Sequence, residues 1–335
     1  MQRNFHLDQM RVIACVMVIA IHVCNIYNRA FPDLSHVDYT IAALVNAMSR
    51  ISVPIFFMIS GALMAGRTPD LQKSLRRFFK YLAITVFWCV FYWIWGRFYL
   101  QKSYDFHDLL TVPTSKHLWY LYALLAIYLA LPLIQTLIRG LSDKMLNYLL
   151  ILFGISVFGG YLLDFISVPI QYPIALIAEN QYLGFFILGY VLYHREIPIR
   201  TGTCGILFTL SVLLVTVGTC WKSFAHNAHK DVYFQYRNPL LVLAAACAFL
   251  ILLRLPKGSI PRAWEKFVRH VADNSFGIYI FHAVFLNCID REINMPGVPA
   301  WFGIVLFIAV IFVLSDLSVT LYKRVARAVL PSHTR

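Results

Sequence analysis

The most obvious shortage in this sequence is charge. Aspartate, glutamate, lysine and arginine make up 13% of its 335 residues, while 60% of the residues are hydrophobic. Soluble domains have about a quarter of their residues charged. The composition therefore excludes an ordinary soluble domain and favours an all-α integral membrane protein.

Several catalytic signatures are also absent. The chain has no G-x-S-x-G nucleophile elbow, no Walker lysine loop, no Rossmann glycine pattern and no H-E-x-x-H helix. Its seven cysteines are scattered and include no C-x-x-C pair. The sequence gives no support for a hydrolase, an ATPase, a dehydrogenase or a zinc protease, and we predict no metal site.

What the chain does contain is a series of apolar runs that can cross a ~30 Å hydrocarbon core as helices. We predict a single domain, residues 1–335, built as a bundle of about ten transmembrane helices. Their approximate limits are 10–27, 44–64, 79–99, 117–138, 146–163, 177–193, 203–220, 238–254, 271–289 and 299–321. Asp8 and Arg11 lie at the start of the first run, and no small-residue cleavage site follows it. We therefore expect a helix that is retained rather than a signal peptide that is cleaved.

The distribution of the basic residues predicts the orientation. Most of the 29 lysines and arginines fall in alternate loops on the side of the N-terminus. Because cytoplasmic loops are enriched in these residues, both termini are predicted to be cytoplasmic. This bias explains most of the net charge of +13. We therefore expect no nucleic-acid partner, since no basic domain carries the charge.

The first apolar run contains Arg11 and, eleven residues later, His22. Positions eleven apart lie within about 20° on a helix, with His22 about 16 Å deeper, and Asp8 falls on nearly the same face. Ionisable side chains inside a bilayer are costly and usually functional. His22 could take a proton from a hydroxyl or attack an acyl carbon itself. Asp8, about 21 Å away along the axis, cannot orient it directly. The alternative is a histidine hydrogen-bonded between helices.

The second apolar run contains SRISVPIFFMISG, residues 49–61. Pro54 lacks the backbone N–H of a helical hydrogen bond and therefore permits a kink. Arg50 is either a terminal charge that reaches the interface or a contact for an anionic part of an outer substrate.

A basic cluster precedes the third run, with Arg76, Arg77 and Lys80 on the expected cytoplasmic side. Such charges suit a phosphate-rich ligand. Ordinary positive-inside flanking, or contact with anionic membrane lipids, is the alternative.

Two further segments carry polar groups at suggestive spacings. His117 and Trp119 open the fourth run at the outer interface, where an aromatic belt alone explains Trp119. Ser275, Tyr279 and His282 follow the i, i+4, i+7 pattern and share one helix face. Hydrogen bonding between helices is the alternative for this polar face.

Taken together, these motifs resemble the acyltransferase-3 family of bacterial integral-membrane acyltransferases over essentially the whole chain. The marks are Arg11 and His22 as the R-x10-H pair, Asp8 before them, SVPIFFMISG, the basic cluster, HLWYL and SFGIYIFH. The resemblance implies transfer of an acyl group, usually from cytoplasmic acetyl-CoA, to a hydroxyl of a surface glycan or of a lipid-linked sugar precursor. It also implies a multi-pass protein of the bacterial cytoplasmic membrane.

The resemblance assigns roles as follows. His22 would be catalytic with Arg11 as its companion and Asp8 beside them, and the basic cluster would bind CoA phosphates. Where the family often ends that cluster in arginine, this chain has Lys80, which keeps the charge and loses the fork. Outer residues would contact the acceptor, and those we predict are Arg50, His117, Trp119, Tyr279 and His282. We expect a stand-alone form without a fused hydrolase-like domain, which transfers directly or through a separate partner.

Two other classes compete with this interpretation. A secondary transporter or flippase for a small anionic or glycolipid substrate would also use a helical bundle with buried ionisable residues, although no paired, glycine-interrupted half-helices are visible. A sensor or scaffold without activity would have no need for both Arg11 and His22. The sequence predicts neither the acceptor nor the oligomeric state.

Overall fold

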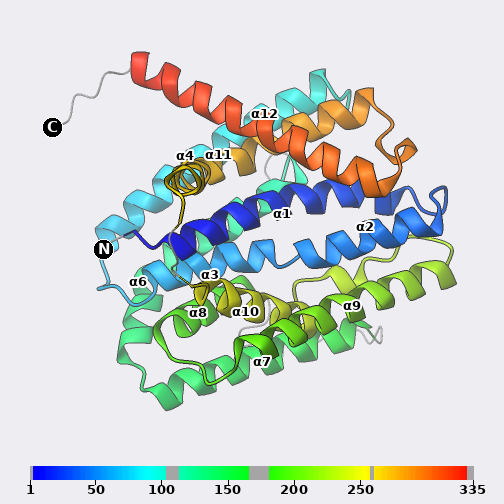
Figure 1. Cartoon of the computed structure of the whole chain (residues 1–335). Helices are drawn as coiled ribbons and strands as arrows, with labels where there is room; N and C mark the ends of the chain where they lie inside the picture. Colours follow the sequence, from blue (N-terminus) through cyan, green and yellow to red (C-terminus); the bar gives the residue numbers. More distant parts are fainter. Residues whose placement is uncertain (1–2, 103–112, 166–180, 257–259, 330–335) are drawn as a thin grey trace.

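The computed structural model describes residues 3–102, 113–165, 181–256 and 260–329, and within these ranges the regular elements are helices. The α-helices are α1 (Phe5–Arg29), α2 (His36–Ser49), α3 (Ser52–Met64), α4 (Leu71–Phe98), α6 (Trp119–Gly140), α7 (Asp143–Phe165), α8 (Gln181–His194), α9 (Thr201–Ala225), α10 (Pro239–Leu253), α11 (Arg262–Glu292) and α12 (Ala300–Val329). They form an elongated bundle in which most axes run along one direction (Figure 1). The prediction of an all-α membrane bundle is confirmed.

Eight segments of the described chain are long and apolar enough to cross a membrane. They correspond to eight of the ten predicted runs. The sixth and ninth runs, which overlap α8 and α11, are not among the eight, and their membrane crossing stays a prediction. Part of the sixth run lies outside the described residues.

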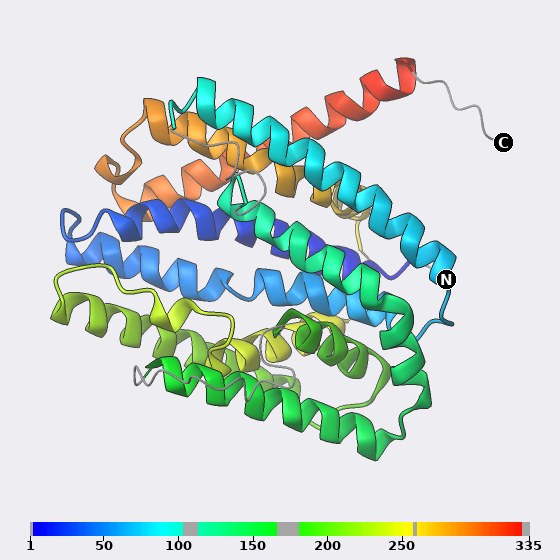
Figure 2. The same cartoon turned by 180° about the vertical axis from the view of Figure 1, so that it is seen from behind.

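The start of α1 and the end of α12 lie at the same end of the bundle, seen at the left in Figure 1 and at the right in Figure 2. This end also holds the first turn of α4 and the turn that joins α6 to α7. We call it the basic end, after the lysines and arginines that gather there, and we call the other end the opposite end. The positive-inside rule predicts that the basic end faces the cytoplasm.

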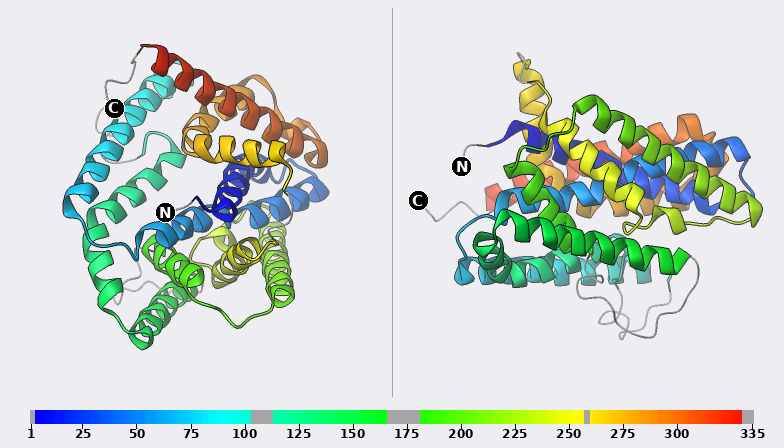
Figure 3. Two further views of the ribbon diagram at one scale, coloured as in Figure 1. Left: turned by 60° about the vertical axis from the view of Figure 1, so that its left-hand side comes forward. Right: turned by 90° about the horizontal axis from the view of Figure 1, so that it is seen from below.

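Helix α1 is the central element of the bundle and is enclosed by other helices (Figure 3). It packs against α2, α3, α11 and α12. Its N-cap is Asn4, whose side chain accepts a hydrogen bond of 3.0 Å from the backbone N–H of His6. The helix begins at Phe5, earlier than the predicted start at residue 10, because a capped polar turn extends it. Since it continues to Arg29 without a break, Arg11 and His22 lie on one helix, about 16 Å apart along its axis.

The second predicted span is two helices rather than one. Helix α2 ends at Ser49 and α3 begins at Ser52, so the chain is interrupted at Arg50 and Ile51. Pro54 has no N–H with which to reach the carbonyl of residue 50, and this missing bond explains why the helix breaks one turn before the proline. The break places Arg50 at a corner of the backbone.

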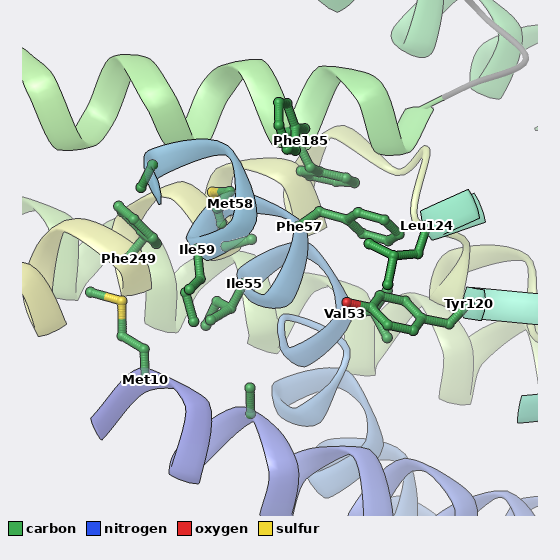
Figure 4. Packing of buried hydrophobic residues seen from close by; sticks show 14 of the residues in the cluster. Met10, Val53, Ile55, Phe57, Met58, Ile59, Tyr120, Leu124, Phe185 and Phe249 are labelled. Atoms are coloured by element: carbon green, nitrogen blue, oxygen red, sulfur yellow. The ribbon is translucent and has the colours of Figure 1, made fainter. Parts of the chain in front are cut away.

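Helix α3 crosses α8 at very close range. A Cβ added to Gly61 would collide with the backbone carbonyl of Phe186, and one added to Gly189 would collide with the backbone of Met58. The two glycines thus let two backbones touch, as small residues do in membrane bundles. Around this crossing lies the main apolar cluster (Figure 4), which includes Met10, Ile59, Phe185 and Phe249.

Helix α11 is longer than the sequence indicates. The sequence predicts a span at 271–289, whereas one helix runs from Arg262 to Glu292. A polar network at Asn274 joins this helix to α12. Asn274 donates to Asp316 at 2.7 Å, and Lys323 donates to the Asn274 side chain at 2.7 Å.

Candidate active site

Three histidines from three distant segments meet near the opposite end of α1. His22 comes from α1, His282 from α11, and His117 from a short 3-10 helix (Lys116–Leu118) that precedes α6. The ring centroid of His22 lies 5.0 Å from that of His282 and 6.4 Å from that of His117. The rings of His117 and His282 are 5.2 Å apart. The structure therefore gathers a three-histidine cluster around the histidine that the sequence singled out.

Hydrogen bonds fix two of these rings. Nδ1 of His282 donates to the backbone carbonyl of Tyr279 at 2.5 Å, which leaves Nε2 with its lone pair. Nδ1 of His117 contacts Ser115 Oγ at 2.8 Å. The Nε2 atoms of both rings are buried and have no hydrogen-bond partner in the described structure. Buried polar atoms without partners are uncommon and often belong to functional sites.

Two tyrosines tie the segments of the cluster together. The Tyr279 hydroxyl donates to the backbone carbonyl of His117, and the Tyr92 hydroxyl donates to the carbonyl of Ile280 at 2.6 Å. The Tyr92 ring also packs edge-on against His117 at 4.9 Å. Helices α4 and α11 and the 3-10 helix are thereby held in one arrangement around the histidines.

A cavity of about 870 Å³ opens beside the cluster, and we call it the opposite-end cavity. His22 and His117 line it, whereas His282 is fully buried behind them. Its polar lining includes Asn25, Arg50 and Tyr236. The cavity is large enough for a sugar-sized ligand and presents the His22 ring to it.

A second cavity, of about 230 Å³, lies nearer the other end of α1, and we call it the basic-end cavity. Arg11 lines it, together with mostly apolar and aromatic side chains from α3, α4, α6 and α11. Four residues line both cavities and form a common wall between them. These are Val18, Val53, Tyr120 and Tyr279. Arg11 and His22 thus face two chambers that meet at Val18, which lies between them on α1.

A family comparison decides what kind of protein this arrangement belongs to. The model of an acyltransferase domain family matches residues 4–319 of the 335. The chain belongs to this acyltransferase family. Searches of curated proteins and of solved structures gave no significant match. The resemblance seen in the sequence motifs is therefore confirmed at the level of the family.

Asp8 and Arg11, near the start of α1 in this acyltransferase family member, form a pair of their own. Asp8 is 1% exposed and accepts from Arg11 at 2.8 Å and from Arg3. Arg3 in turn pairs with Asp273 of α11. As expected from the helix rise, the Asp8 carboxylate does not reach His22. It holds Arg11 at the basic-end cavity instead.

The basic cluster of α4 is divided by the helix surface. Arg77 is half-buried and its guanidinium donates to the Sδ atom of Met64, which lines the basic-end cavity. Arg76 and Lys80 are exposed at the same end of the bundle. The structure therefore places Arg77 at the rim of this cavity and leaves the other two charges facing outward beside it.

Unlike the basic cluster, the residues predicted to contact the acceptor lie together at one site. Arg50, His117, Trp119 and Tyr279 all line the opposite-end cavity, and His282 contacts the two histidines that do. Among the described residues, no set of three or more histidine, cysteine, aspartate or glutamate side chains has the spacing of metal ligands.

Sequence reasoning missed several lining residues. Asn25 is one turn after His22 and could have been found by the same helical periodicity. Tyr92, Tyr120 and Tyr236 were assigned no role, because tyrosines in apolar helices look like ordinary packing or interface residues until the fold brings them to the cavity.

Proposed function

We propose that this protein transfers an acetyl group from acetyl-CoA, bound from the basic end, to a hydroxyl group presented at the opposite end. The acceptor would be a cell-surface polysaccharide or its lipid-linked precursor, and the membrane would be the bacterial cytoplasmic membrane. The observation that carries the proposal is the pair of cavities that approach His22 from the two ends and share one wall of four side chains. An enzyme that joins a cytoplasmic donor to an outer acceptor needs such an arrangement.

The basic-end cavity suits the donor. It is narrow and lined by apolar and aromatic side chains such as Ile59, Leu63 and Tyr128, with Arg11 at its edge. The slender arm that carries the thioester would occupy this cavity, while the phosphates would stay among Arg76, Arg77 and Lys80. Arginine forks and lysine charges bind phosphate groups well.

The chemistry needs one proton acceptor beside the thioester carbonyl, and His22 has the required freedom. Its ring makes no hydrogen bond to the described residues and faces the opposite-end cavity. As the acceptor oxygen bonds to the carbonyl carbon, its proton passes to the free nitrogen of His22. The carbon–sulfur bond then breaks, and the imidazolium returns the proton to the departing thiolate.

The two neighbouring histidines, His117 and His282, help to position His22. Because Nδ1 of His282 is committed to the Tyr279 carbonyl, the His282 ring is held in one orientation against His22. His117 is similarly fixed through Ser115. We infer that both rings position His22, since a general base must be held within hydrogen-bonding reach of its proton.

The test is mass spectrometry of surface glycans from a deletion strain that carries the wild-type gene, a His22→Ala gene or an empty vector. A species heavier by one acetyl group in the wild type alone would support the proposal and identify the acceptor. Identical glycans in all three strains, with the protein present in the membrane, would contradict it. A transporter would use the same cavities without consuming acetyl-CoA, so turnover of acetyl-CoA by purified protein separates the two functions.

A further inference from the structure

The lining of the opposite-end cavity has an unbalanced charge. Among the described lining residues, the basic side chains are Arg29, Arg50, Lys102 and Lys116, and the acidic one is Asp290. Not one of these four cations has a carboxylate within ion-pair distance in the described structure. A cavity lined in this way attracts anions and raises their local concentration.

Arg50 is the most strongly positioned of these cations. Its Nε donates to the side-chain oxygen of Asn46 at 3.1 Å, and an Nη donates to that of Asn25 at 3.3 Å. Asn46 also donates to Asn25 at 2.9 Å, so the two amides are locked to each other. The guanidinium carbon lies 5.0 Å from the Phe234 ring centroid and 5.9 Å from that of Tyr236.

All of these partners are electrically neutral. They hold the guanidinium in place without cancelling its charge, and the side chain is half-buried in the break between α2 and α3. Desolvating a cation in this way is costly unless an anion compensates it. A preorganised arginine with spare N–H donors is the usual protein group for binding a phosphate or a carboxylate in bidentate fashion.

The position of this charge relative to His22 defines what would bind. Asn25 and Arg29 follow His22 at i+3 and i+7 on α1 and line the same cavity. They lie about 5 and 10 Å beyond His22 along the helix axis, toward the opposite end. An anion on Arg50 would therefore lie within about one sugar ring of the histidine. Trp119 and Tyr236, whose rings are 5.9 Å apart, line the same cavity.

We propose that the acceptor is anionic: the sugar to be acetylated carries, or is directly linked to, a phosphate or carboxylate group that binds Arg50, with Arg29 contributing. This inference rests on the proposed function for the word acceptor, whereas the anion site itself does not. A smaller cavity of about 270 Å³ adjoins Arg50, lined also by Arg237 and Asp231, and gives the rest of the acceptor room to extend.

The experiment uses the full-length protein in lipid nanodiscs at low salt. Binding of inorganic pyrophosphate, of glucuronate and of uncharged glucose is measured for the wild type, Arg50→Gln, Arg50→Lys and Lys222→Gln. Lys222 is the matched control, because it is a cation over an aromatic ring, 5.1 Å from the Phe165 centroid, that does not line the cavity. An Arg76→Gln, Arg77→Gln double variant removes the expected CoA phosphate site.

We expect at least one of the two anions, and not glucose, to bind the wild type and Lys222→Gln alike, and to keep its Arg50-dependent binding in the double variant. Arg50→Gln should weaken that binding about 10- to 100-fold, as expected for the loss of a charged hydrogen-bonding partner, and Arg50→Lys should weaken it less. Pyrophosphate as the tighter probe would identify a phosphate-linked acceptor, and glucuronate an acidic sugar. If neither anion binds the wild type, or if folded Arg50→Gln binds as tightly, the inference is wrong.

Arg29→Gln serves as a second variant in case Arg50→Gln does not fold. If folded Arg29→Gln and Arg50→Lys both bind the anion as tightly as the wild type, the inference is also wrong. Acetyl-CoA turnover on the same samples separates the two proposals. Turnover without anion binding would remove the anionic acceptor and leave the acetyltransferase. Anion binding that depends on Arg50, without any turnover, would remove the acetyltransferase and leave the anion site.

Discussion

The two cavities differ in how the protein treats the arginine that lines each of them. At the basic end, Arg11 pairs with Asp8, a carboxylate that is 1% exposed and is also bound by Arg3. At the opposite end, Arg50 is held by two asparagine amides and two aromatic rings, with no carboxylate nearby among the described residues. Both guanidiniums are fixed in place, but only the first is neutralised.

This difference indicates two uses of charge in one bundle. A neutralised pair stabilises the fold and fixes the helix that carries His22, and it has little charge left for a ligand. A fixed cation without a counter-charge is a cost to the fold that a bound anion can offset. Substitutions at the two ends should therefore separate into effects on chemistry, on passage between the cavities, on stability and on donor binding.

The largest effect is expected at His22. Replacing it with alanine should lower acetyl transfer by about 10²- to 10⁴-fold, the usual contribution of a general base. Folding should be little affected, because the half-buried ring makes no hydrogen bond to the described residues. Transfer is measured by acetyl content of the glycan at matched protein levels. Undiminished acetylation by well-expressed His22→Ala would rule out His22 as the proton acceptor. An acetyl group found on His22 of the wild type would mean that this residue carries the acetyl group covalently.

The next effect tests whether the two cavities work as one path. Val18 belongs to the common wall, so Val18→Phe should obstruct the passage and lower transfer about 10²-fold, as small misplacements of reacting groups do. Binding of acetyl-CoA and of anions at the two ends should persist, since their charged contacts are unchanged. Val18→Ala is the control that leaves the path open. Full transfer by a stably folded Val18→Phe protein would mean that donor and acceptor meet elsewhere.

The third prediction concerns stability at the basic end. Asp8→Asn removes the charge that neutralises Arg11 and Arg3 and should lower the free energy of unfolding by about 2 kcal/mol, less than for a fully buried pair because Arg11 is 30% exposed. Asp70→Asn is the matched control. It removes an exposed pair with Lys73 and keeps a side-chain oxygen for the N-cap of α4, so its effect should stay below about 1 kcal/mol. Equal melting temperatures for the two variants would show that the Asp8 cluster is not structural.

The sequence predicts some parts of this comparison and not others, for physical reasons. The spacing of Arg11 and His22 on one helix is readable because helical periodicity is local. The helix break after Ser49 is indicated by Pro54. The meeting of His22 with His117 and His282 is not readable, because it depends on how distant helices pack.

The status of Arg50 is hidden for the same reason. Its position suggested either an interfacial charge or an anion contact, and only its neutral surroundings separate these. Asn46 precedes Arg50 by one helical turn, but Asn25 comes from α1 and Tyr236 from the segment before α10. The group of side chains that holds the guanidinium therefore exists only in the folded chain. Likewise, the spacing that puts Arg76 and Lys80 on one face gives no sign that Arg77 is the residue turned toward the cavity.

The smallest expected effect follows from that last point. Alanine at both Arg76 and Arg77 should raise the KM for acetyl-CoA about tenfold and change kcat little, because charges that hold the phosphates act equally on bound donor and transition state. Of the single variants, Arg77→Ala should be the more damaging, since Arg77 contacts Met64 at the cavity rim while Arg76 is exposed. Lys73→Ala, about one turn away on the same helix and already paired with Asp70, is the control. A loss confined to kcat would place these arginines in the chemical step. Equal increases of KM in the two single variants would mean that the combined charge of the basic end holds the donor, and not Arg77 alone at the cavity rim.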